Sequence, residues 1–160
     1  MAEKDFAELL QSFNKRRVRY CIVGAYAVAF HARPRYTKDL DILVDPSIEN
    51  GRKIIAALKD FGFGELQLTP DDFMQPGRWI QLGYEPLRVD LLTSIEGFTF
   101  EQVWRHRALG RYGKVRTSFI GRDELVRNKE LSGRLQDQAD LERLRPSRVR
   151  RIKGSKPDEY

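Results

Sequence analysis

The stretch Ile22-Val-Gly-Ala-Tyr-Ala-Val-Ala-Phe-His-Ala-Arg-Pro-Arg-Tyr-Thr-Lys-Asp-Leu-Asp-Ile-Leu-Val-Asp45 contains the features that decide how this chain folds. Its apolar beginning predicts a strand that ends at Gly24, and the Ala-rich run at residues 25–31 predicts a buried helix. A second apolar strand follows and carries Asp39 and Asp41. Because successive side chains of a strand point to opposite faces, these two carboxylates share one face, roughly 6.5–7 Å apart along the chain.

Paired carboxylates on an apolar strand indicate a cation. They repel each other and desolvate poorly unless a positive charge lies between them. A third carboxylate, Asp90, lies in another predicted strand at residues 87–92, and Mg²⁺ prefers such hard oxygen ligands. We therefore expect Asp39, Asp41 and Asp90 to bind Mg²⁺ or Mn²⁺. Asp45 ends its strand and is interpreted instead as a turn residue that caps the next helix.

Gly24 lies at the predicted turn from strand to helix. Free backbone N–H groups and the helix dipole favour a phosphate at such a turn, and glycine lets the backbone approach a ligand closely. The alternative is an ordinary tight turn, which usually explains a single glycine before a helix. The order of the features, a turn followed by paired aspartates and a third aspartate, favours phosphate binding.

The composition indicates one globular, soluble domain. The 160 residues are 41% apolar and 32% charged, which suffices for a core. The net charge of +6 suggests an anionic partner, although a run without acids at residues 143–156 supplies much of it. The single cysteine, Cys21, excludes an intramolecular disulfide, and with two histidines it excludes a zinc finger. We expect Cys21 to be buried and unreactive.

We expect a domain at residues 1–145 and a basic tail at residues 146–160. The N-terminus lacks the apolar segment of a signal peptide, so we expect a cytoplasmic protein with no membrane attachment. Helices that alternate with strands early and hairpins that come later predict an α/β fold with a mixed (α+β) sheet. The expected helices span residues 5–16, 25–31, 48–61, 98–105, 123–131 and 135–144. The expected strands span residues 19–23, 40–44, 79–82, 87–92, 109–112 and 114–120. Residues 64–78 are interpreted as a loop, with a short strand at residues 66–68 as the alternative.

The ordered set Gly24-Ala25, Asp39-Leu40-Asp41 and Asp90 resembles the nucleotidyltransferase superfamily of the DNA polymerase β type. Surrounding residues are similar to the AbiEii-like branch of small bacterial nucleotidyltransferases, and the resemblance covers about residues 17 to 145. Those residues are Gly24-Ala25-Tyr26-Ala27, His31, Pro34-Arg35-Tyr36-Thr37 and Lys129…Gly133-Arg134…Asp137…Asp140-Leu141. The chain departs from the wider family at Ala25, which keeps the backbone amide but lacks the hydroxyl or the freedom of the usual Ser or Gly.

The resemblance implies a nucleotidyltransferase-like core with C-terminal helices. It implies that Asp39 and Asp41 bind metal and triphosphate, and that Asp90 holds the catalytic metal and helps to activate the acceptor. It also implies that Gly24 and the Ala25 amide bind phosphate.

The resemblance leaves several roles open. Lys129 either reaches the nucleotide phosphates or is a solvated helix residue. Thr37 contacts the nucleotide or, as we favour, caps the turn before Asp39. Arg35 and His31 contact phosphate or acceptor, or support the turn. Three residues are expected to join the last helices through ion pairs: Arg134, Asp137 and Asp140.

These implications predict a Mg²⁺-dependent enzyme that moves NMP from an NTP such as ATP to a hydroxyl. The acceptor is RNA (tRNA) or a protein, and the setting is a toxin–antitoxin or abortive-infection pair with a cognate partner. The alternative is a non-catalytic module of the same fold that binds nucleotide, or that binds nucleic acid through its basic tail. A subunit that works only with a partner protein is also compatible with the sequence.

Overall fold

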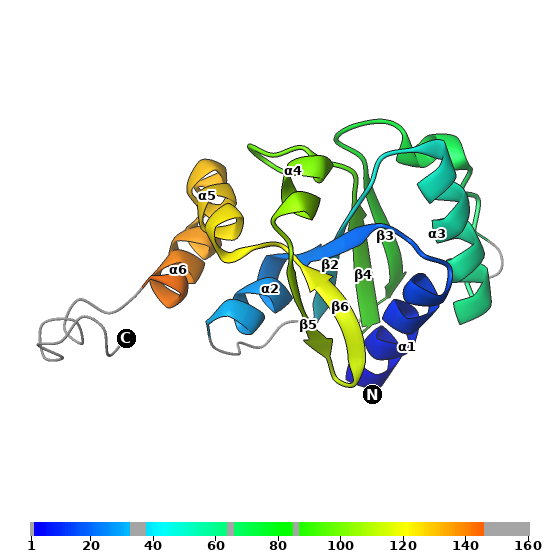
Figure 1. The fold of residues 1–160 in the computed structure, drawn as a ribbon, viewed down its shortest axis with the longest axis horizontal. Coiled ribbons are helices and arrows are strands. Elements are labelled where there is room, and N and C mark those ends of the chain that lie inside the picture. Colours follow the sequence, from blue (N-terminus) through cyan, green and yellow to red (C-terminus); the bar gives the residue numbers. More distant parts are fainter. Residues whose placement is uncertain (1, 33–37, 64–65, 85–86, 146–160) are drawn as a thin grey trace, which may run out of the picture.

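A computed structural model describes residues 2–32, 38–63, 66–84 and 87–145. Within these ranges the chain forms one six-stranded mixed sheet with helices around it (Figure 1). The elements in chain order are α1 (Ala2–Lys15), β1 (Tyr20–Val23), α2 (Gly24–His31), β2 (Asp39–Val44), α3 (Ile48–Phe61), a 3₁₀ turn (Pro70–Phe73), β3 (Trp79–Tyr84), β4 (Leu87–Leu92), α4 (Phe100–Arg105), β5 (Ala108–Tyr112), β6 (Val115–Phe119), α5 (Arg122–Ser132) and α6 (Leu135–Leu144).

The sheet is mixed, as predicted. Its strand order is β3-β4-β2-β1-β6-β5. β2 pairs antiparallel with β1 and parallel with β4, and β1 pairs parallel with β6. The predicted hairpins β3–β4 and β5–β6 are confirmed. β2 therefore lies inside the sheet, with a partner on each side.

Alternation along β2 gives one wholly apolar face and one face that carries both aspartates and the buried Leu43. Leu40, Ile42 and Val44 are fully buried on one face. Asp39 and Asp41 are half-buried on the other face, which confirms that the two carboxylates share a face.

Helices α1 and α3 pack against each other beside the sheet, whereas α5 and α6 form a second pair that contacts α2 (Figure 1). The inner stripe of α1 is apolar and buried, consisting of Phe6, Leu9, Leu10 and Phe13, as its helical spacing predicts. Helix α5 ends where Gly133 adopts φ +68°, so the predicted interruption there is confirmed.

One prediction was wrong. Asp45 does not cap α3: Ser47 does, and its side chain accepts a hydrogen bond from the Asn50 N–H, while Asp45 pairs with Arg19 instead. Residues 66–68 do not form a strand, so the loop interpretation holds for them. Leu66 and Leu68 are half-buried against the core and line a small space with residues of α3, so packing on a helix replaces strand pairing.

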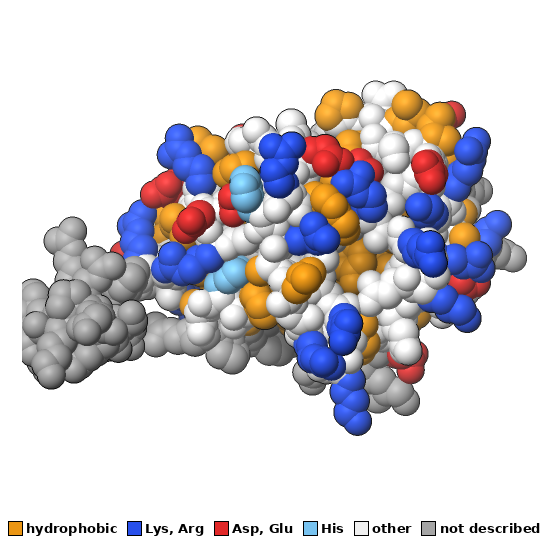
Figure 2. Space-filling model, in the orientation of Figure 1, with side chains coloured by type: hydrophobic (Ala, Val, Ile, Leu, Met, Phe, Trp, Pro, Cys, Tyr) orange, Lys and Arg blue, Asp and Glu red, His pale blue; other side chains and the backbone are white. Residues whose placement is uncertain are grey.

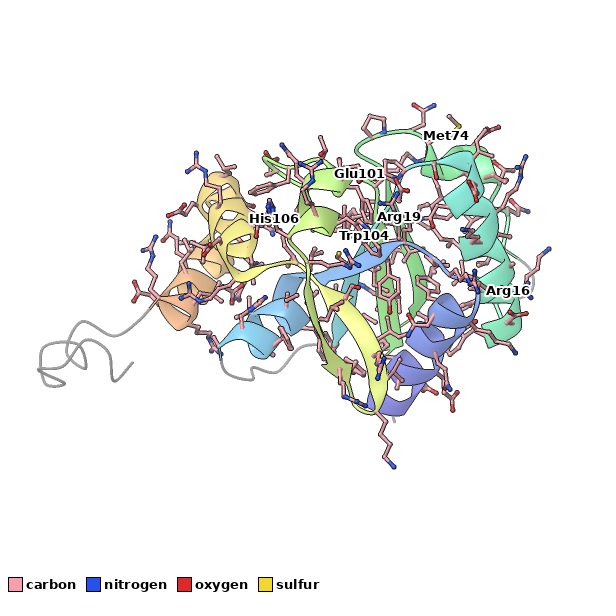
Figure 3. All side chains as sticks on the ribbon, viewed as in Figure 1. Arg16, Arg19, Met74, Glu101, Trp104 and His106 are labelled. Atoms are coloured by element: carbon pink, nitrogen blue, oxygen red, sulfur yellow. The ribbon has the colours of Figure 1, made fainter. Side chains whose placement is uncertain are left out.

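Arg19 joins the beginning of β1 to α4. Its guanidinium pairs with Asp45 at 2.9 Å and with Glu101 at 2.8 Å. It also lies 5.0 Å from the ring centroid of Trp104, a favourable cation–π distance. Figure 3 shows Arg19, Glu101 and Trp104 gathered at this junction. The cluster holds α4 against the central strands.

The surface in Figure 2 carries Lys and Arg side chains across most of its extent. Acidic side chains lie among them: residues 1–142 hold 22 Lys and Arg against 21 Asp and Glu, so the net charge of +6 comes mostly from residues 143–156. The tail predicted at residues 146–160 lies outside the described residues. No helix of the described ranges is both long enough and apolar enough to cross a bilayer.

Asn50 connects α3 to the sheet through its buried side chain. Its Oδ1 accepts from the Arg19 N–H at 2.8 Å, and its Nδ2 donates to the carbonyls of Arg19 and Asp45 at 3.1 Å each. The side chain therefore satisfies three backbone groups at the point where β1 begins and β2 has ended.

We predict that Asn50→Ala lowers the free energy of unfolding by about 1–3 kcal/mol, because it leaves buried backbone groups without partners. Urea unfolding monitored by circular dichroism measures this change. Asn128→Ala is the control, since Asn128 makes one exposed hydrogen bond, to the Glu96 carbonyl. Equal losses in the two variants would contradict the prediction.

Candidate active site

Asp41 and Asp90 come together at the centre of the sheet. They are directly opposite each other in the parallel β2–β4 pair, and Asp90 is only 5% exposed. The structure thus brings together two predicted site residues that come from different strands and lie 49 positions apart in the chain.

Gly24 packs directly against the Asp41 carboxylate. A Cβ atom at Gly24 would lie 2.2 Å from Asp41 Oδ2, and the residue has φ +69°. Both the contact and the backbone conformation therefore require glycine. The turn that begins α2 and the carboxylate of β2 form one unit. The adjacent Ala25 lies in the first turn of α2, where backbone N–H groups lack partners within the helix.

The pKa of Asp41 is raised to about 7. Burial is the main cause, followed by the charge of Asp90 and the hydrogen bond with it, and then by the charge of Asp39. The ammonium of Lys129 acts in the opposite direction. The Asp41 carboxyl group is thus crowded by two neighbouring carboxyl groups and keeps its proton up to near neutral pH.

Asp39 has a different environment. It lies opposite Arg88 in the register of β2 and β4, and Arg88 Nε is 3.5 Å from Asp39 Oδ1. Among the residues that the structure describes, no group of three or more His, Cys, Asp or Glu side chains is arranged to hold a metal ion. The three-carboxylate site therefore stays a prediction.

The chemistry of the Asp41–Asp90 pair fits a divalent cation. The two adjacent carboxyl groups offer hard oxygen ligands, and a cation between them would replace the Asp41 proton and offset their repulsion. Asp41 and Asp90 would hold the ion, with Asp39 beside them.

Lys129 is buried in an ion-pair cluster. Its side chain is 7% exposed, and its Nζ lies 2.9 Å from Asp137 Oδ1 and 3.0 Å from Asp140 Oδ2. The interpretation of Lys129 as a solvated lysine is therefore wrong. Its influence on the pKa of Asp41 shows that its charge acts on the site. Contact between Lys129 and phosphate stays a prediction.

Arg134 is a cation whose position near the site the sequence did not indicate. Its Nε bonds Asp137 Oδ2 at 3.0 Å, and three quarters of its side chain is exposed. The hydrogen bond and charge of Asp137 raise the pKa of Arg134, and the charges of Asp41 and Asp140 add to this. The predicted ion pairs of Arg134, Asp137 and Asp140 are confirmed, but Arg134 also borders the candidate site.

Three further predictions concern neighbouring residues. His31 Nε2 lies 2.6 Å from the Ile120 carbonyl oxygen, a contact that supports the end of α2. Thr37 and Arg35 lie outside the described residues. Cys21 is fully buried, and burial raises the pKa of its thiol to about 12, so its predicted lack of reactivity agrees with its environment.

We predict that Gly24→Ala destabilises the fold and displaces Asp41, because the added methyl group would overlap the carboxylate. Gly113→Ala is the matched control, since Gly113 also has positive φ (+59°) but a Cβ there meets nothing within 4 Å. Thermal unfolding should show the larger loss for Gly24→Ala. A loss no larger than that of Gly113→Ala would show that the contact with Asp41 is unimportant.

We predict that, with metal chelated, Asp41→Asn is more stable than wild type at high pH. The folded protein keeps the Asp41 proton up to about pH 7, whereas the unfolded chain loses it near the ordinary value of 3.8. The unfolded state therefore binds fewer protons in this window, and wild-type stability falls as pH rises through it.

Urea unfolding in EDTA at several pH values measures this difference. The variant should exceed wild type by about 1 kcal/mol or more above pH 7, and the gap should close toward pH 4. A gap of constant size at all pH values would contradict the raised pKa.

No protein-family model and no curated protein matches this chain. Six chains of known structure resemble it. One is the lincosamide antibiotic adenylyltransferase LnuA bound to lincomycin, with a TM-score of 0.55 and 16% sequence identity, and the match covers 90% of this chain and 96% of that chain. At this identity the likeness concerns the fold alone. The mixed α/β core of this protein is thus a fold shared with a nucleotidyltransferase.

Proposed function

We propose that this protein is a nucleotidyltransferase that moves NMP from an NTP to a hydroxyl group. The observation that carries the proposal is the Asp41–Asp90 pair, packed against the Gly24 turn at the beginning of α2. Its fold likeness to an adenylyltransferase supports the same chemistry. At 16% identity the likeness shows the fold, and the activity is our proposal.

The site residues take separate roles in this proposal. Backbone N–H groups at Gly24 and Ala25 bind the triphosphate at the positive end of α2. Asp41 and Asp90, with Asp39 beside them, hold Mg²⁺ or Mn²⁺, which when bound supplies charge stabilisation for the reacting phosphate. Asp41 must lose its proton before it binds the ion.

The acceptor hydroxyl reacts at the α-phosphorus. Its oxygen forms a new P–O bond while the bond from the α-phosphorus to the bridging oxygen of pyrophosphate breaks. Asp90 receives or orients the hydroxyl proton. Its strand, β4, lies on the side of β2 opposite β1, and therefore away from the Gly24 turn where the triphosphate binds in this proposal. The exposed guanidinium of Arg134 offsets phosphate charge. Asp137 and Asp140 form ion pairs with the Lys129 ammonium, so in this proposal Lys129 acts on the site through its charge.

We also propose that the acceptor is RNA, such as tRNA, or a protein, and that the enzyme acts within a toxin–antitoxin pair. The late run from Lys129 to Leu141, which resembles the AbiEii-like branch, supports this assignment. A small molecule is the competing acceptor, because LnuA was solved with lincomycin.

The proposal predicts label transfer from an NTP. Wild-type protein is incubated with each α-³²P-labelled NTP, Mg²⁺ and one of three acceptors: total RNA, a protein lysate or lincomycin. We expect label in one fraction, and we expect Asp41→Asn and Asp90→Asn each to lower the rate roughly 10²-fold or more, the scale of a positioned acid–base group.

Two controls make the result specific. Asp60→Asn changes an exposed aspartate that pairs with Arg16, and it should retain the wild-type rate. Asp41→Asn should be folded, because we predict that it is stabilised at neutral pH, so its inactivity would not reflect unfolding. No label with any NTP, together with equal Mg²⁺–ATP binding by wild type and Asp41→Asn in calorimetry, would refute the proposed function.

A further inference from the structure

β3 lies at one edge of the sheet, next to β4 (Figure 1). In the antiparallel register of these strands, Gln81 is opposite Asp90 and Trp79 is opposite Leu92. Directly opposite residues share a face, so Trp79 and Gln81 lie on the face that carries Asp90. The Gln81 side-chain amide lies within 3.4 Å of Asp90 Oδ1, and its oxygen accepts hydrogen bonds from Arg88 Nε at 2.8 Å and Arg88 Nη2 at 3.1 Å.

Trp79 exposes its side chain on this face. It is 62% exposed, whereas its strand neighbours Ile80 and Leu82 are buried on the opposite face. Among the described residues, no aromatic ring or cation stacks on its indole. Isolated exposed apolar residues are common on proteins. Trp79 differs because the Trp79–Leu92 pair is the next pair on this face after Gln81–Asp90, which includes a carboxyl group of the candidate site. Its position distinguishes it from Leu109, which is equally exposed on the far edge strand β5.

The strand order places the two substrates on opposite sides of Asp41. Gly24, where the triphosphate is proposed to bind, follows β1 on one side, and β4 and β3 lie on the other. An acceptor hydroxyl that reaches Asp90 must therefore approach across β4 and β3. That approach passes Gln81 and Trp79.

We propose that Trp79 is the acceptor-recognition residue of this protein, and that it stacks on a nucleobase of a single-stranded RNA. The inference rests on the proposed function for the hydroxyl at Asp90 and names the class of acceptor. Gln81 lies between the indole and Asp90, where its amide faces the sugar or the base edge.

Two features favour RNA over a protein acceptor. Trp79 and Asp90 are diagonal neighbours across the antiparallel β3–β4 pair, and such neighbours are separated by about 7–8 Å, so they are spaced to hold a base and the hydroxyl of its own or the adjacent ribose. Aromatic stacking accepts any base, because each base has a flat face.

The test measures binding of a fluorescein-labelled single-stranded RNA by anisotropy at fixed salt. Trp79→Ala should weaken binding roughly 5- to 150-fold, the range for the loss of one stacked base. Trp79→Phe should retain a large part of the affinity, because it keeps an aromatic face. Leu109→Ala, the matched exposed control on the other edge strand, should bind like wild type. Calorimetry with Mg²⁺–ATP should give the same dissociation constant for all four proteins.

Other outcomes would overturn the inference. Equal RNA affinity of Trp79→Ala and wild type would exclude stacking at this residue. A parallel loss of ATP affinity would mean that Trp79 contacts the donor base. Loss of labelling of a protein acceptor, with RNA binding unchanged, would assign Trp79 to a protein partner. Failure of the proposed function gives a different result, because wild type would then neither bind Mg²⁺–ATP in an Asp41-dependent manner nor transfer label.

Discussion

The burial of Asp41 beside Asp90 is the constraint on which the rest of the site depends. Two carboxyl groups on adjacent inner strands are desolvated and repel each other, which raises the pKa of Asp41 to about 7. A sheet built only for stability would place apolar side chains there. The neighbours accommodate the carboxylate instead: Gly24 has no side chain where Asp41 Oδ2 lies, and Lys129 contributes a positive charge. This arrangement is expected where binding, not packing, determines the residue types.

The C-terminal helices belong to the same electrostatic unit. The ammonium of Lys129 on α5 is held by Asp137 and Asp140 on α6, and all three side chains are buried. Buried ion pairs add little net stability, because desolvation opposes their attraction, but removal of one partner is strongly destabilising. The cluster therefore fixes where α5 and α6 lie relative to α2 and leaves Arg134 exposed beside the site. In this way a helix pair late in the chain completes a site that begins at Gly24.

Most of the fold could be predicted from periodicity and from turn residues. The spacing of apolar residues in α1 and α3 matches the buried stripes, and the glycines at positions 62 and 133 end their helices as expected. Residues 66–68, where a short strand was the alternative to a loop, pack beside α3 without strand pairing. Local pattern failed where a tertiary contact competed with it. Asp45 is a good capping residue by type, but Arg19 binds its carboxylate, and Ser47 caps the helix.

The sequence by itself determined that Asp39 and Asp41 share a face, because alternation along a strand is a local property of the backbone. It also determined the order of elements, and it indicated Asp90 as the third carboxylate through its apolar surroundings. Only the tertiary structure decided that Asp90 lies opposite Asp41 and that Asp39 lies against Arg88, because the register between strands depends on long-range pairing. Burial of Lys129 was decided in the same way: a lysine leaves water only where buried carboxylates meet it, and those come from another helix.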